Sequence, residues 1–178
     1  MRRFTYLGIA AALFAVSFVT AVTVLAEEEP AAKAAPLPQK KIDHAFLSGL
    51  VGDWNVKTSG EGPQGPMSGS GRAHFALAAR DTILVQEYES DVLGGMGGHG
   101  VAKVSDDGKT LQMWWFSSHA AEPVLLTGTL TETSAEVSGT CPEGTVDIKW
   151  KKVDGGYDFQ MSLNGKPSFT DTYRKSSG

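Results

Sequence analysis

The stretch that most resembles a ligand-binding motif is LGGMGGHG, residues 93–100, which contains five glycines and a histidine. Residues 95–100 formally fit Gly-x-Gly-x-x-Gly, which cradles a pyrophosphate where a strand leads into a helix. The residues that follow, VAKVSDDGK, instead predict a strand and a hairpin turn, so no helix N-terminus would receive the phosphates. We interpret the segment as a glycine-rich bend at the start of a strand, with the mobile rim of a binding cavity as the alternative.

Residues that commonly carry catalysis or bind metals are scattered along the chain. The four histidines are His44, His74, His99 and His119. None of them fits the H-x-H or H-E-x-x-H spacing of zinc sites. Ser117 and Ser118 precede His119, but neighbours on a strand point to opposite faces, and no G-x-S-x-G motif occurs. Cys141 is the single cysteine, so an internal disulfide is excluded. We predict no catalytic residues, no metal and no cofactor.

One segment rich in large apolar side chains gives the strongest indication of binding. Residues 110–118, TLQMWWFSS, place bulky rings on both faces of one predicted strand. A barrel of about ten strands is wide enough to enclose a cavity, and a lining of aromatic and methionine side chains would suit an apolar or aromatic ligand. Core filling is the competing interpretation. The residues expected to line the cavity and orient a ligand are Gln86, Glu87, Tyr88, Trp114, Trp115 and His119.

The elements that must position these residues are nearly all β-strands. Helical spacing is confined to IDHAFLSGLVGDW at residues 42–54, where Gly52 ends a short amphipathic helix. Beyond it, apolar and polar residues alternate in about ten short segments, most clearly at residues 157–163, and hairpin turns such as SDDGK and NGK connect them. We predict an all-β fold, a single antiparallel up-and-down barrel of about ten strands, because closure removes exposed edges. A β-sandwich is the alternative.

The order of several motifs resembles the lipocalin superfamily. Gly52-Asp53-Trp54 follows the predicted helix, and TDTYRK at residues 170–175 closes the domain. Between them, LVQEY at 84–88 and MGGHG at 96–100 resemble a family of bacterial lipocalin-like proteins that is known as a domain of unknown function. The resemblance implies a calycin-type barrel over residues 42–175. It also implies that Arg174 packs over Trp54, next to Gly52, and closes the barrel base through a cation–π contact.

Residues 1–26 have the layout of an export signal. Arg2 and Arg3 precede an uncharged apolar run over residues 4–26, and small residues stand before the acidic EEE that follows. Signal cleavage predicts a periplasmic or extracellular protein. If the run is retained, it is long enough to anchor the chain in a membrane. Residues 27–41, rich in Ala, Pro and charge, predict a disordered linker.

The net charge of the chain argues against nucleic acid as a partner. The chain has 16 Lys and Arg residues, of which Arg2 and Arg3 lie in the predicted signal, so 14 remain against 20 Asp and Glu, a net charge of −6. This acidic excess disfavours nucleic acid, whose phosphates need clustered basic residues.

The sequence therefore predicts an exported, non-catalytic, lipocalin-like barrel that binds a small apolar or amphipathic molecule. The first alternative is an envelope structural or interaction protein, with a solid barrel and the glycine-rich loops at 59–71 and 93–100 as its binding surface. The second is a weak enzyme that uses His119 or Glu87 inside the barrel. A cavity in the barrel distinguishes the main prediction from the first alternative.

Overall fold

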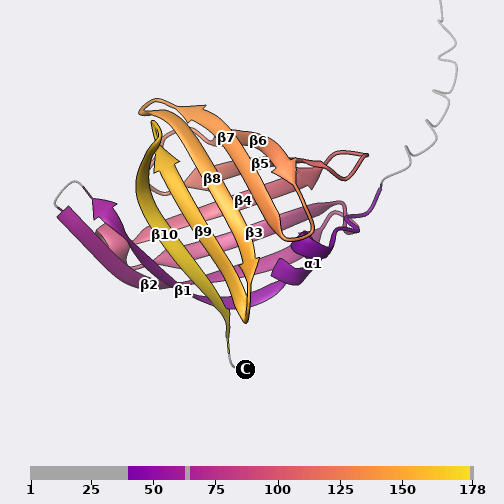
Figure 1. Ribbon diagram of the computed structural model, residues 1–178, viewed down its shortest axis with the longest axis horizontal. Coiled ribbons are helices and arrows are strands. Elements are labelled where there is room, and N and C mark those ends of the chain that lie inside the picture. The colour runs from indigo at the N-terminus through magenta and orange to yellow at the C-terminus, as the bar shows by residue number, and fades with distance from the viewer. Residues whose placement is uncertain (1–39, 63–64, 177–178) are drawn as a thin grey trace, which may run out of the picture. The chain divides into compact units, whose positions relative to one another are not determined.

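The computed structural model describes residues 40–62 and 65–176 (Figure 1). The predicted signal, residues 1–26, and residues 27–39 of the predicted linker lie outside the described residues. No helix in the part of the chain that the structure describes is long and apolar enough to cross a membrane.

A short helix precedes ten antiparallel strands. The elements are α1 (Ala45–Leu50), β1 (Gly52–Gly62), β2 (Gly65–Ala78), β3 (Ile83–Ser90), the 3-10 turn η1 (Val92–Gly94), β4 (Met96–Val104), β5 (Thr110–Ser117), β6 (Val124–Leu130), β7 (Ser134–Cys141), β8 (Gly144–Val153), β9 (Gly156–Leu163) and β10 (Lys166–Lys175). Each strand pairs with the next in sequence, and β1 pairs with β10, so the sheet closes into a barrel (Figure 1). The predicted fold class, an all-β up-and-down barrel with one short leading helix, is confirmed.

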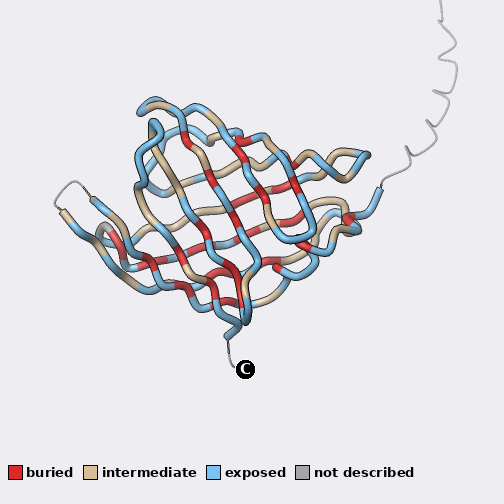
Figure 2. The backbone as a smooth tube through the Cα atoms, viewed as in Figure 1, coloured by how far each residue is buried: buried red, intermediate tan, exposed pale blue. Residues whose placement is uncertain are grey.

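Side chains alternate between the interior and the solvent along each strand, as pleating requires. On β3, for example, Gln86 and Tyr88 are buried while Glu87 and Glu89 are exposed. The buried positions of successive strands lie side by side and form one core inside the barrel (Figure 2). The direction of each side chain therefore follows from its place in this alternation.

The helix fills one end of the barrel, which we call the closed end. Phe46, Leu47 and Leu50 are buried there. The Phe46 and Trp54 rings each meet the ring of Tyr157 edge-on, with centroids 5.3 Å apart in both pairs. Two hydrogen bonds fix the helix to the barrel, because Trp54 Nε1 donates to the Leu50 carbonyl at 2.6 Å and the Tyr157 hydroxyl donates to the Phe46 carbonyl at 3.2 Å.

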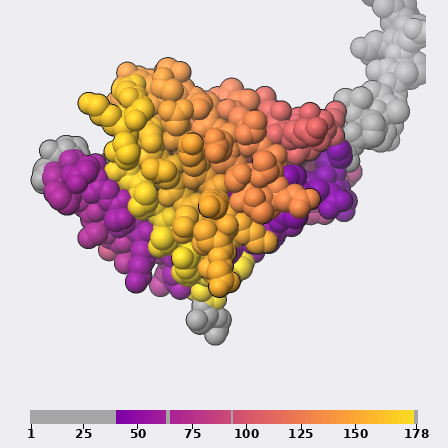
Figure 3. Space-filling model, in the orientation of Figure 1, coloured from indigo at the N-terminus to yellow at the C-terminus, as the bar shows by residue number. Residues whose placement is uncertain are grey.

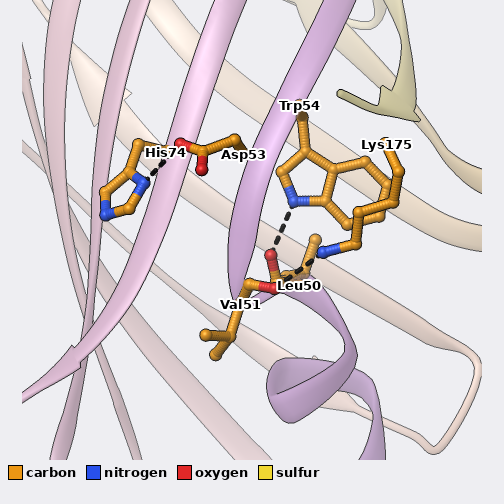
Figure 4. Close-up of polar contacts among 6 residues, drawn as sticks. All are labelled: Leu50, Val51, Asp53, Trp54, His74 and Lys175. Carbon is orange, nitrogen blue, oxygen red and sulfur yellow. Dashed lines mark hydrogen bonds and ion pairs between the residues drawn. The ribbon is translucent and has the colours of Figure 1, made fainter. Parts of the chain in front are cut away.

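The predicted contact between Trp54 and Arg174 is wrong, because Lys175 takes that place (Figure 4). Lys175 Nζ lies 4.1 Å from the centroid of the Trp54 ring and donates to the Val51 carbonyl at 2.7 Å. The register of β1 and β10 explains the difference. Trp54 stands opposite Lys175, and opposed residues share a face of the sheet. Arg174 is one residue earlier and faces outward, where its Nη1 lies 3.8 Å from Asp158 Oδ1.

Gly52, which begins β1, lies next to this contact. Its φ of 119° lies in the region that favours glycine, and an added β-carbon would stand 2.8 Å from Lys175 Nζ. A larger residue at this position would strain the backbone and displace the lysine.

Candidate functional site

A cavity of about 240 Å³ occupies the part of the barrel interior farther from α1. Inward side chains of β3 to β10 form its wall, and most of them are apolar, including Met113, Trp115 and Phe159. Ala120 and Glu143, in the β5–β6 and β7–β8 connections, line its outer part. We call the barrel end with these two connections the open end. The cavity lies within the barrel, whose face over β7 to β10 is covered by outward side chains (Figure 3).

The glycine-rich segment shapes this cavity. Gly94 and Gly95, with φ of 81° and 107°, turn the chain from η1 into β4. A β-carbon on Gly98 would collide with the ring of Trp115, and one on Gly100 would lie 3.0 Å from Met113 Cε. The interpretation as a bend at the start of a strand is confirmed, and the glycines have a second effect. They leave the space inside β4 that the side chains of β5 enter.

A buried polar cluster interrupts the apolar wall. Asp171 is 2% exposed and lines the cavity. Thr58 Oγ1 donates to Asp171 Oδ1 at 2.6 Å, and the Tyr173 hydroxyl lies 3.5 Å from Oδ2. The Tyr88 hydroxyl lies 3.3 Å from Thr58 Oγ1 and also interacts with the Asp171 carboxyl group. Gln86, also buried, is a further polar residue of the wall, and Ser117 and Glu143 line it as well.

The cluster carries a perturbed carboxyl group. Burial raises the pKa of Asp171 from its ordinary value near 4 to about 6, because leaving water penalises the charged form, and hydrogen bonds from neighbouring hydroxyls offset this only in part. Burial also raises the pKa values of Tyr88 and Tyr173, and the nearby Asp171 charge raises both further. Near neutral pH the cluster therefore holds one carboxylate and two neutral phenols.

Three of the predicted cavity residues line the cavity: Gln86, Tyr88 and Trp115. The predicted inward placement of Glu87 and Trp114 is wrong, because each is the neighbour of an inward residue on the same strand and so faces outward. Glu87 Oε1 lies 2.6 Å from His99 Nδ1, and Trp114 stands opposite the exposed Leu125 on β6.

The placement of His119 is also corrected. This residue lies beyond the end of β5, in an exposed connection, where its Nε2 is 3.0 Å from the Gly95 carbonyl. The strand β5 ends at Ser117, and His119 follows two residues later in the connection to β6. His119 therefore contacts the outside of the glycine-rich bend rather than the cavity.

The outward residues form a second, shallower hollow of about 300 Å³ across β1 to β3. Its polar groups include Glu87 and the pair His74–Asp53, whose Nδ1 and Oδ1 atoms are 2.7 Å apart (Figure 4). These side chains are largely exposed, and each already has a partner, since Asp53 pairs with His74 and Glu87 pairs with His99. We therefore place the candidate site in the interior cavity. Among residues 40–62 and 65–176, no three histidine, cysteine or acidic side chains come together as a metal site would require.

Sequence reasoning missed Asp171 and Thr58. A signal was present in the last strand, where Phe169, Asp171 and Tyr173 alternate with Thr170 and Thr172. An acidic residue in phase with two aromatic residues indicates an inward carboxylate. Alternation along β7 likewise places Cys141 inward, where it is half-buried and lines the cavity near the open end.

Comparison with known proteins supports the barrel architecture. No protein-family model matches the sequence, and no curated protein matches it. The structure is similar to the crystal structure of Rv2717c from M. tuberculosis, with a TM-score of 0.58 and 15% sequence identity over 74% of this chain and 95% of that chain. At this identity the similarity shows the fold alone. The resemblance to lipocalin-like proteins stays a prediction.

Proposed function

We propose that the protein is a binding protein that holds a small, mainly apolar molecule in its barrel and performs no chemical step on it. The observation that carries the proposal is the cavity of about 240 Å³ inside the barrel. Protein interiors are close-packed and contain few voids larger than a water molecule, so a cavity of this size is unusual and points to a bound molecule.

The volume and the wall define the kind of ligand. A dry apolar cavity of about 150 Å³ accommodates benzene, and most drug-sized ligands occupy roughly 300–1,000 Å³. The cavity lies between these limits and therefore fits a molecule of one or two rings. Trp115, Trp150 and Phe159 supply aromatic surface to the wall, which favours an aromatic ligand.

The alternative of a solid scaffold that binds a partner through its loops has less support. The interior is not filled by side chains at the open end. Most of the 59–71 stretch belongs to β1 and β2, which are paired with each other, and 96–100 belongs to β4. Residues 96–100 are therefore part of the barrel wall. Residues 65–70 pair with β1 alone, so they form the outer strand of a hairpin that extends past the β2–β3 pairing, which begins at Gly71.

We also propose that the protein is exported, from the layout of residues 1–26 and the small residues before Glu27. Cell fractionation with the whole chain, together with N-terminal sequencing, tests this proposal. A mature protein that begins at Glu27 supports it, and recovery of the whole chain from the cytoplasm contradicts it.

Ligand binding is tested by titrating the protein with toluene while following tryptophan fluorescence, because Trp115 and Trp150 line the cavity. Indole has the same emission as tryptophan, so its binding is followed by calorimetry. Native mass spectrometry of protein from the organism that makes it reports a ligand that is already bound. We expect saturable binding and a change in fluorescence. If neither probe saturates and no ligand is retained, the proposal is wrong.

A matched pair of variants locates the binding site. Met161→Trp adds a large ring to the cavity wall, while Gln160→Trp adds the same ring to the outer face of β9. We expect the first variant to abolish toluene binding and the second to leave it unchanged. Equal binding by both variants would place the ligand elsewhere.

A further inference from the structure

We propose that the ligand carries a basic nitrogen and that its ammonium group pairs with the Asp171 carboxylate inside the cavity. This inference rests on the function proposed above and names its ligand class: small aromatic or apolar amines. It follows from three observations, namely the position of Asp171, the groups around it and the surface of the wall.

The first observation is that Asp171 is almost fully buried yet faces the cavity. An ionised carboxylate has about four acceptor sites. The protein supplies a short hydrogen bond from Thr58 to Oδ1 and a long one, 3.5 Å, from Tyr173 to Oδ2, and the Tyr88 hydroxyl is a third donor to the carboxyl group. Acceptor capacity therefore remains for a donor that enters from the cavity.

The second observation is the lack of a positive partner. Within residues 40–62 and 65–176, no lysine, arginine or histidine forms an ion pair with Asp171. Buried charges in proteins are normally paired, because burial removes their hydration. A ligand cation supplies the missing charge, whereas a ligand anion would be repelled.

The groups that face Asp171 come from several strands. They are Thr58 on β1, Tyr88 on β3, Phe159 on β9 and Tyr173 on β10. The titratable ones are the two tyrosines, whose raised pKa values keep them neutral below pH 10. Cys141 and Glu143, the other titratable groups on the wall, lie near the open end. Asp171 is therefore the group that changes charge in the inner part of the cavity near neutral pH.

The third observation is the aromatic surface around the carboxylate. Trp115, Trp150 and Phe159 line the same cavity. A cation over an aromatic face is attracted to the ring, most strongly where water is excluded. The wall therefore accommodates an ammonium group and the apolar body of an amine at the same time.

The test compares benzylamine with toluene, which has nearly the same shape and no charge, on the whole protein. At pH 8 we expect Asp171→Asn to weaken benzylamine binding about 10- to 100-fold, the size of a lost charge-assisted hydrogen bond, and to change toluene binding little. Asp158→Asn removes a carboxylate from the outer face of β9 and should affect neither probe.

The pH dependence of the wild-type protein tests the same point without a substitution. Benzylamine stays protonated between pH 5 and 8, while Asp171, with a pKa of about 6, is mostly neutral at pH 5. We expect benzylamine to bind about 10-fold more weakly at pH 5 than at pH 8, and toluene to bind equally at both.

The outcomes separate the two proposals. If toluene binds and benzylamine is insensitive to both Asp171→Asn and pH, the basic-nitrogen inference is wrong and the binding function stands. If neither probe binds the wild-type protein, both proposals are wrong. If Asp171→Asn fails to fold, the pH comparison in the wild-type protein decides.

Discussion

At the closed end, side chains of α1 pack inside the barrel against Trp54 and Tyr157, whereas at the open end the inward side chains surround a cavity of about 240 Å³. The same strands run through both regions. The closed end has a helix that contributes buried apolar side chains, and the open end has strand connections and one 3-10 turn. The barrel is therefore packed at the closed end and has room for a ligand at the open end.

Trp150 and Tyr173 lie between the two regions. Their ring centroids are 5.0 Å apart, and Phe75, packed edge-on against Trp150 at 5.8 Å, belongs to the closed end. Trp150 and Tyr173 also line the cavity, so the top of the packed core is the floor of the site. Because the cavity wall is separate from the packed core, substitutions in the wall should cost little stability. The following predictions test this separation.

The largest expected effect comes from truncating a ring in each region. Phe46→Ala at the closed end should lower the free energy of unfolding by about 3–5 kcal/mol, because Phe46 is fully buried. Phe169→Ala on the cavity wall should cost about 1–2 kcal/mol, because part of that ring already faces empty space and lacks contacts. Urea denaturation of both variants measures the difference. Equal losses would show that the two ends are packed alike.

A smaller effect comes from the carboxyl group at the cavity floor. The pKa of Asp171 is raised to about 6 in the folded protein and stays near 4 in the unfolded chain, so between these values the folded state holds an extra proton. Stability should therefore fall as pH rises from about 4 through 6, by up to about 3 kcal/mol, and stay level above that. In Asp171→Asn this fall should disappear.

Denaturation midpoints measured at several pH values check this prediction, with Asp158→Asn as the control that keeps the wild-type slope. An identical pH profile in Asp171→Asn and the wild type would mean that Asp171 titrates normally and that the cavity floor is as wet as the surface.

The smallest expected effect concerns the outer edge of the closed end. Lys175→Ala should lower the free energy of unfolding by about 0.5–1 kcal/mol, the contribution of an exposed cation–π contact. Arg174→Ala should cost less, because its partner Asp158 is also at the surface and exposed ion pairs contribute little. Thermal denaturation of both variants checks the order. A larger loss for Arg174→Ala would support the contact that the sequence resemblance implied.

The sequence allowed the strands and closure to be predicted, because period-2 alternation and hairpin turns are local signals. The sequence did not show which residues of LVQEY and QMWWF face the barrel interior, since both stretches have large side chains on both faces. The sequence therefore predicts Glu87 and Trp114 inside the barrel, whereas alternation along β3 and β5 places them outside. Pairing across the barrel is not local either. Lys175 reaches Trp54, and Asp171 reaches Thr58, only through the β1–β10 register.

Cys141 gives the cavity a practical property. It is the single thiol of the chain, it is half-buried, and it lies on the wall near the open end. A small fluorinated tag coupled to it has one attachment point, without any engineered substitution. The signal of such a tag would report solvent and occupant exchange inside the barrel directly, so the wild-type chain is already suited to serve as its own sensor.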